Sequence, residues 1–216
     1  LVRVCNLAAK CFSLFLIIIN KIPYKLTLNL CVLPAGRGSN LKAISNAHKP
    51  GMKRVRSKVV LVISNNSSSG ALRTAAKHKI PSYHLSLKLF KNQKEYDKKF
   101  LSLLNEFNID MIILAGYMKM ISPVVIRKYK NRILNIHPAL LPRFGGKGMY
   151  GINVHKAVLK AGVNTSGATV HLVDEHYDHG AIILQKQVLV KPGDDAETLR
   201  KRVLRAEHKL YPEVIR

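Results

Sequence analysis

The chain alternates short aliphatic runs with amphipathic stretches over most of its length. Runs rich in Val, Ile and Leu, each closed by Gly, Pro, Ser or Asn, predict buried strands at 27–33, 58–64, 82–85, 110–116 and 132–136. Stretches with helical periodicity lie between them, at 40–47, 69–79, 91–107 and 123–129. This repeated order of strand, helix and strand predicts one α/β domain built on a doubly wound, mainly parallel sheet with flanking helices.

The order of elements changes after Gly151. A helix over 152–161 precedes two extended runs, 167–173 and 181–190, which the polar segment 174–180 joins. A final helix is expected to begin at Asp194 or Asp195, because Asp194 and Glu197 have the spacing of a capping box. Its apolar residues recur at helical spacing and predict packing on the sheet. They are Leu199, Val203, Ala206, Leu210 and Val214.

The first 25 residues differ from the rest of the chain. Residues 11–19 are strongly apolar but too few to span a bilayer as a helix, and they follow a positively charged, acid-free start. We interpret residues 1–25 as a leader or an extension outside the domain, and residues 26–216 as the domain. The three cysteines form no Cys-x-x-Cys pair, which favours a reducing compartment. A cytoplasmic location is expected, or an organellar one if the leader is a targeting signal.

Charge is unevenly distributed along the 216 residues. Lys and Arg total 36 against 12 Asp and Glu, a net charge of +24, and no acidic residue precedes Glu95. Such an excess is typical of proteins that bind nucleic acids or anionic membranes. However, the basic residues are mostly Lys, they are scattered singly, and only 6% of residues are aromatic. Nucleic-acid surfaces interleave Arg with stacking aromatics, so no nucleic-acid or membrane partner is expected, and compositional drift is the preferred explanation.

A glycine-rich turn, Gly36-Arg37-Gly38-Ser39-Asn40, lies between a predicted strand and a predicted helix. Backbone N–H groups and the helix dipole make such a turn suitable for a phosphate group. The turn lacks the third glycine and the later acid of a dinucleotide site, and the Lys-Ser/Thr ending of a nucleotide triphosphate loop. A small phosphomonoester is therefore the predicted ligand. The alternative is a turn that binds nothing.

Asn135 and His137 come at the end of a predicted strand. Alternate strand residues project to one face, so the amide and the imidazole are expected together, with Ile136 on the other face. An amide donor beside an imidazole can stabilise an oxyanion and relay a proton, as acyl transfer requires. Ligands of doubly wound folds collect at the carboxyl edge of the sheet, where this strand ends. The alternative is a structural, hydrogen-bonded histidine.

The segment 174–180 holds three acids and two histidines, a combination that is costly unless something organises it. His171, His176 and His179 are candidate zinc ligands, but they form no closed set with the usual spacing, so no metal is expected. The other interpretations are a carboxylate that orients a catalytic histidine and a solvated acidic turn.

Glu207 lies at the edge of the apolar stripe of the final helix, half-turned toward the sheet. A carboxylate at that position can accept a substrate amine. Pairing with a nearby Lys is the simpler alternative.

Six segments resemble, in order and spacing, the phosphoribosylglycinamide formyltransferases, the folate-dependent glycinamide ribonucleotide transformylases of purine synthesis. The segments are GRGSNLKAI (36–44), AGYMKMIS (115–122), NIHPALLP (135–142), GATVH (167–171), YDHG (177–180) and EHKLYP (207–212). The resemblance implies the formyltransferase fold. It also implies transfer of the formyl group of 10-formyltetrahydrofolate, the co-substrate, to the amine of N1-(5-phospho-D-ribosyl)glycinamide in de novo purine (IMP) biosynthesis. Glycinamide ribonucleotide and formyl-folate are thus the implied partners, without a metal, for a monomer or homodimer.

The resemblance also implies a role for each matching site residue. Asn135 would hydrogen-bond the formyl oxygen, His137 would stabilise the tetrahedral intermediate as an acid, and Asp178 would orient His137 and help move a proton through water. Glu207 would bind the attacking amine. The remaining residues are Gly38, Ser39 and Asn40 for the phosphate, Lys94 as a point charge where relatives have an Arg, and Met118, Lys119, Met120, Ile121, Ile133 and Val173 for the folate.

Two departures from the family pattern flank this expected site. Pro34 and Ala35 stand where relatives usually have an aliphatic residue and Ser, and Pro34 removes a backbone donor just before the phosphate loop. The stretch 145–151 is expected to form a flexible loop near the folate. The alternatives kept open are a formyltetrahydrofolate deformylase, which would hydrolyse rather than transfer, and a basic nucleic-acid-binding module with a decayed catalytic set. A methionyl-tRNA formyltransferase fits less well, because it lacks the Gly-Ser-Asn loop.

Overall fold

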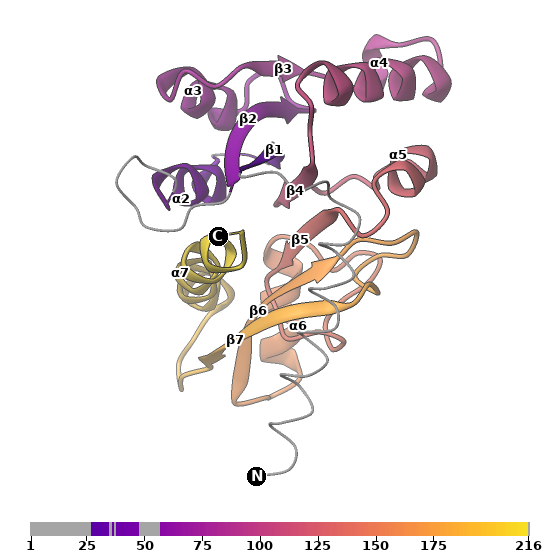
Figure 1. Cartoon of the computed structure of the whole chain (residues 1–216). Coiled ribbons are helices and arrows are strands. Elements are labelled where there is room, and N and C mark those ends of the chain that lie inside the picture. The colour runs from indigo at the N-terminus through magenta and orange to yellow at the C-terminus, as the bar shows by residue number, and fades with distance from the viewer. Residues whose placement is uncertain (1–26, 35, 37, 48–56, 216) are drawn as a thin grey trace.

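The computed structural model describes residues 27–34, 36, 38–47 and 57–215 (Figure 1). The proposed leader, residues 1–25, and the departure at Ala35 lie outside this part of the chain. The strands are β1 Leu28–Pro34, β2 Ser57–Ser64, β3 Ser82–His84, β4 Met111–Ala115, β5 Ile133–His137, β6 Thr165–Leu172 and β7 Ile182–Leu189. The helices are α2 Ser39–Ala47, α3 Gly70–Lys77, α4 Gln93–Glu106, α5 Pro123–Lys128, α6 Ile152–Lys160 and α7 Ala196–Ile215, with a short 3₁₀ helix at Leu87–Leu89.

The strands form one sheet in the order β3-β2-β1-β4-β5-β6-β7. The first five in this order pair in parallel, and β6 and β7 are antiparallel additions. The predicted doubly wound, mainly parallel sheet is confirmed. The chain runs outward from β1 to β3 and then returns to place β4 on the other side of β1, so the topological switch point lies between β1 and β4. Ligands of such folds bind outside the carboxyl ends of strands at this crevice.

Helices cover both faces of the sheet, as Figure 1 shows for α2 and α7 on one side and α4 and α5 on the other. Alternate residues of the strands enter two separate cores: Val32 and Ile113 pack with α2, α3, α6 and α7, whereas Leu33 and Ile112 pack with α4 and α5. Strands buried on both faces read as continuous aliphatic runs, which explains why they are visible in the sequence.

The second of the two predicted starting residues caps the last helix. Asp195, not Asp194, caps α7: its carboxylate accepts the Thr198 N–H at 2.7 Å, and the Thr198 hydroxyl accepts the Asp195 N–H at 2.9 Å. Asp194 is instead paired with Arg202, which donates to its Oδ1 at 2.8 Å. The predicted capping box of Asp194 and Glu197 is therefore wrong by one residue, because an ion pair within the folded chain recruits Asp194.

Tyr211 docks α7 onto the centre of the sheet. Its buried hydroxyl lies 2.9 Å from the carbonyl oxygen of Leu114 in β4 and 3.0 Å from that of Leu134 in β5. One helical turn earlier, Glu207 is thereby held beside the carboxyl ends of the strands. Within the described residues, no helix is both long and apolar enough to cross a membrane.

Candidate active site

The phosphate-loop segment is fixed by close packing. Gly38 has a φ of +73°, and a Cβ there would lie 2.7 Å from Cα of Ala71 in α3, so only glycine fits. The Ser69 hydroxyl donates to the Gly36 carbonyl at 2.9 Å and ties the turn to the start of α3. The α2 helix then begins at Ser39 with no acidic residue in its first turn. Pro34 is the last residue of β1: it lies beyond the end of the β1–β2 pairing at Val32 and is in register with Ala115 of β4 on the other side.

One cleft of about 730 Å³ lies at the carboxyl ends of β1, β4 and β5. It brings together most of the predicted site residues, and its size is that of a small-molecule site. The predicted residues that line it are Ser39, Asn40, Met118, Lys119, Met120, Ile121, Asn135, His137, Val173, Asp178 and Glu207.

Three predicted residues do not line this cleft. Gly38 is buried against α3, as described above, and contributes the turn itself. Ile133 is 1% exposed and lies in the core between the sheet and α4 and α5. Lys94 is exposed on α4, while its neighbour Gln93 lines a second cavity of about 390 Å³ that shares Lys119 and Met120 with the main cleft.

His137 is buried at the end of β5 between two acceptors. Its Nε2 lies 2.8 Å from the carbonyl oxygen of Phe144, and its Nδ1 lies 3.4 Å from Oδ2 of Asp178. A carbonyl oxygen only accepts, so Nε2 carries a proton, and a second proton on Nδ1 would face the carboxylate. Burial lowers the pKa of His137, and the charge of Asp178 opposes that shift. The ring is thus placed to change protonation state during a reaction.

Asn135 is oriented by His171, its partner in the antiparallel pairing of β5 with β6. Nδ1 of His171 lies 2.8 Å from the Leu172 carbonyl oxygen and must carry the ring proton. Nε2 is then free to accept the Asn135 amide N–H at 3.1 Å. Sequence reasoning offered His171 only as a metal ligand; its position opposite Asn135 depends on strand register, which the residue pattern does not reveal.

Asp178 lies close to both His137 and His171. Its Oδ2 accepts the Gly146 N–H at 3.0 Å, and its Oδ1 lies 3.5 Å from Nε2 of His171. Burial opposes ionisation, but the charge of His137 and the Gly146 N–H outweigh burial and lower the pKa of Asp178. The carboxylate therefore stays charged beside His137. The predicted grouping of Asn135, His137 and Asp178 is what the structure brings together.

Glu207 faces the other end of the cleft and is only 8% exposed. Its Oε2 accepts from Nδ2 of Asn40 at 2.8 Å rather than pairing with a Lys. Burial raises the pKa of Glu207 to about 7, although Asn40 and Arg200 act in the opposite direction. Oδ1 of Asn40 is buried and has no hydrogen-bond partner among the described residues. A carboxylate and a free amide oxygen thus form a site for an N–H donor.

His155 and Arg200 also line the cleft, and sequence reasoning missed both. His155 is 1% exposed on α6, and its Nδ1 has no partner within the described part of the chain. Burial, followed by the charge of Arg200, lowers the pKa of His155 to about 4. His155 lies on a helix that follows a Gly-rich segment, and no sequence motif there indicates a functional residue.

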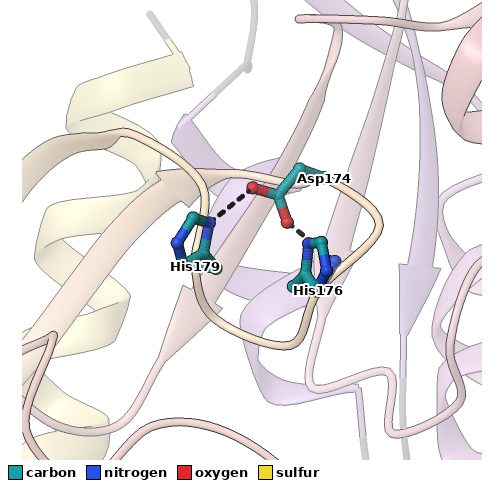
Figure 2. A group of neighbouring side chains, drawn as sticks. All are labelled: Asp174, His176 and His179. Atoms are coloured by element: carbon teal, nitrogen blue, oxygen red, sulfur yellow. Dashed lines mark hydrogen bonds and ion pairs between the residues drawn. The ribbon is translucent and has the colours of Figure 1, made fainter.

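The loop between β6 and β7 carries a second group of polar side chains, of which Asp174 and His176 also line the cleft. Figure 2 shows Asp174 between two histidine rings: its Oδ2 lies 3.1 Å from Nδ1 of His179, and its Oδ1 accepts the backbone N–H of His176 at 2.8 Å. His171, the third predicted metal candidate, is buried elsewhere and engaged through both ring nitrogens. The histidines at 176 and 179 are therefore grouped with Asp174 and not with His171.

The fold and the site define an α/β enzyme of the formyl-transfer class. The model of the formyl transferase family matches residues 28–215, and the chain belongs to this family. It is 42% identical over 191 residues to a chloroplastic phosphoribosylglycinamide formyltransferase of Vigna unguiculata, covering 86% of this chain and 59% of the relative. It is 43% identical over 186 residues to the trifunctional purine biosynthetic protein adenosine-3 of Bos taurus, covering 86% and 18%, respectively. The chain thus spans less than two thirds of these relatives.

Some solved structures match this chain over most of their own length as well. A glycinamide ribonucleotide transformylase from Geobacillus kaustophilus superposes with a TM-score of 0.81 at 36% identity, covering 88% of this chain and 97% of that one. A phosphoribosylglycinamide formyltransferase from Brucella melitensis gives 0.79 at 38% identity, covering 88% and 94%.

Proposed function

We propose that this protein transfers the formyl group of 10-formyltetrahydrofolate to the amine of N1-(5-phospho-D-ribosyl)glycinamide, as in de novo purine synthesis. The observation that carries the proposal is the shared cleft: an amide–imidazole–carboxylate group at one end and a phosphate-type turn with a buried carboxylate at the other. The names of the relatives above support the same substrates.

The ribonucleotide occupies the α2 end of the cleft in this proposal. Its phosphate lies at the Gly38 turn and the amino end of α2, where backbone N–H groups favour an anion. Its amine lies against Glu207 and the unpartnered Oδ1 of Asn40. A carboxyl whose pKa is about 7 can exchange a proton with the incoming ammonium near neutral pH, which leaves the amine nucleophilic.

The folate lies along Met118–Ile121, with its formyl group near Asn135 and His137. The amine nitrogen attacks the formyl carbon, a C–N bond forms, and the carbonyl electron pair becomes an oxyanion. The Asn135 N–H and protonated His137 donate to that oxyanion. The oxyanion then collapses, the bond from the carbon to N10 of the folate breaks, and the proton lost by the amine is passed through Asp178 and water to N10. Formyl oxygen replaces the Phe144 carbonyl as the acceptor of the His137 N–H.

We also propose the domain limits 26–216, since β1 starts at Leu28 and the family match begins there. Residues 1–25 would be a leader, in keeping with relatives whose names call them chloroplastic, or an extension of a cytoplasmic enzyme. Amino-terminal sequencing of the natural protein tests this, because a cleaved leader predicts a start near residue 26.

The activity is tested with 10-formyl-5,8-dideazafolate and glycinamide ribonucleotide, following the deformylated product by absorbance. Turnover that requires the amine and is lost in His137→Ala is expected. Folded protein without turnover, or turnover undiminished by His137→Ala, would falsify the assignment. Turnover without the amine would identify a hydrolase.

A further inference from the structure

The mouth of the cleft holds a group of side chains that the formyl transfer does not use. Asp174, His176 and His179 each offer one ligand atom, and these atoms all lie within 4.8 Å of one another. The two rings meet edge to face with centroids 5.6 Å apart (Figure 2). Both histidines are exposed, so their positions do not result from packing in the core.

The donor set selects a class of ion. Two imidazoles and one carboxylate, with a fourth position open, are the ligands of an open zinc site. Hard cations such as Mg²⁺ and Ca²⁺ prefer a shell of oxygen atoms instead. Ligands at about 2.0–2.1 Å from a tetrahedral zinc lie roughly 3.4 Å apart, so the group must contract by up to about 1.4 Å. The His179 side chain is 75% exposed and can rotate to do so.

The local charge also favours a cation. No Lys or Arg occurs from residue 161 to residue 185, although the chain has 36 of them, and this window contains three carboxylates. Glu175 is paired with Arg127, and Asp178 is turned into the buried site, which leaves Asp174 for the exposed group. A chain of net charge +24 thus has a locally negative segment where the two imidazoles gather.

We propose that Asp174, His176 and His179 form a binding site for one zinc-like divalent cation, with the fourth ligand position open to solvent. His179 then exchanges its hydrogen bond with Asp174 for a bond to the metal. Bound metal would close the turn 174–179, which also carries Asp178, and so would stiffen that part of the cleft. The site is independent of the proposed transfer, which needs no metal.

Binding is tested by titrating untagged, metal-free full-length protein with Zn²⁺ in a calorimeter, and with Co²⁺ by visible absorption. One equivalent of Zn²⁺ is expected, with a tetrahedral Co²⁺ spectrum and a rise in melting temperature on Zn²⁺ addition. His176→Ala, His179→Ala and Asp174→Asn should each weaken binding by about tenfold or more. Glu175→Gln, a neighbouring carboxylate outside the group, and His78→Asn, an imidazole far along the chain, should leave it unchanged.

Three results would overturn the site: no Zn²⁺ binding by the folded protein, binding that persists undiminished in the His176→Ala/His179→Ala double variant, or Mg²⁺ binding as tight as Zn²⁺ binding. Circular dichroism establishes that each variant is folded. The formyl-transfer assay on the metal-free protein is separate, so failure of one proposal is distinguishable from failure of the other.

Discussion

The loop between β6 and β7 contributes an aspartate to each of two His–Asp groups, which lie in opposite environments. Asp178 is placed between buried histidines, and its side chain is 11% exposed, whereas Asp174 and its histidines face solvent. In the buried group the side chains are held by contacts with one another and with backbone groups, and a change of charge is costly, so the group can control a proton. In the exposed group, water screens the charges and the side chains can rearrange around a ligand. The same residue types therefore have different chemistry because of burial alone.

The largest predicted effect comes from removing the charge of the buried carboxylate. Asp178→Asn should lower kcat about 10³-fold, near 4 kcal/mol, with little change in KM for the ribonucleotide. Asp178 has a φ of +55°, a conformation that Asn tolerates well, so the variant should fold. Asp174→Asn makes the same chemical change in the exposed group and should cost less than about tenfold. Equal losses of kcat in the two variants would contradict the conclusion that burial separates the two groups.

Glu207 is a buried carboxylate whose partner is Asn40 and not a histidine, so it shows the effect of burial without a neighbouring imidazole. Its folded pKa is raised to about 7 from 4.5, so the native state keeps a proton that the unfolded state loses. Its stabilising contribution is complete below pH 4.5 and is lost as pH rises to about 7, a change of roughly 3 kcal/mol. Urea unfolding of the wild type and Glu207→Gln from pH 4.5 to 8 measures the difference. Glu213→Gln, which changes an exposed carboxylate on the same helix, is the matched control, and a flat result for Glu207→Gln would refute the raised pKa.

Most of the fold could be predicted because buried parallel strands appear as continuous aliphatic runs. Each predicted strand and helix is found within a few residues of its expected limits. The start of α7 was predicted to within one residue, but the capping pair was not, since Asp194 and Asp195 each have a suitable partner three residues later. The ion pair of Asp194 with Arg202 decides between them, and that contact exists only in the folded chain.

The grouping of site residues could be predicted only where the residues lie on the same strand. Strand alternation put Asn135 and His137 together, because both lie on β5. The partners of these residues come from elsewhere: His171 from the neighbouring strand and the Phe144 carbonyl from backbone. Asp178 is likewise held by backbone, through the Gly146 N–H. Backbone groups carry no sequence signal, and strand register depends on the tertiary fold.

A smaller effect is expected at the glycine that ends the loop shared by both groups. A Cβ on Gly180 would lie 1.9 Å from the carbonyl oxygen of Leu172, so Gly180→Ala must displace the loop from β6. A loss of about 2 kcal/mol in the free energy of unfolding is expected, with weakened activity and Zn²⁺ binding together. Gly162→Ala, which meets no atom but has a φ of +61°, should cost only about 1 kcal/mol and leave both functions intact. Loss of one function without the other would show that the two groups do not share this anchor.

The smallest effect on stability is expected for the exposed ion pair between Glu175 of the same loop and Arg127 of α5. Arg127 and Glu175 approach to 3.4 Å, with side chains 64% and 50% exposed, so water screens their attraction. A double-mutant cycle of Arg127→Gln and Glu175→Gln, measured by urea unfolding, should give a coupling energy below about 0.5 kcal/mol. Added salt should reduce it further. A coupling well above 1 kcal/mol would mean that solvent screens this side of the loop much less than its exposure indicates. The contrast between the exposed and buried groups would then have to rest on geometry instead of dielectric environment.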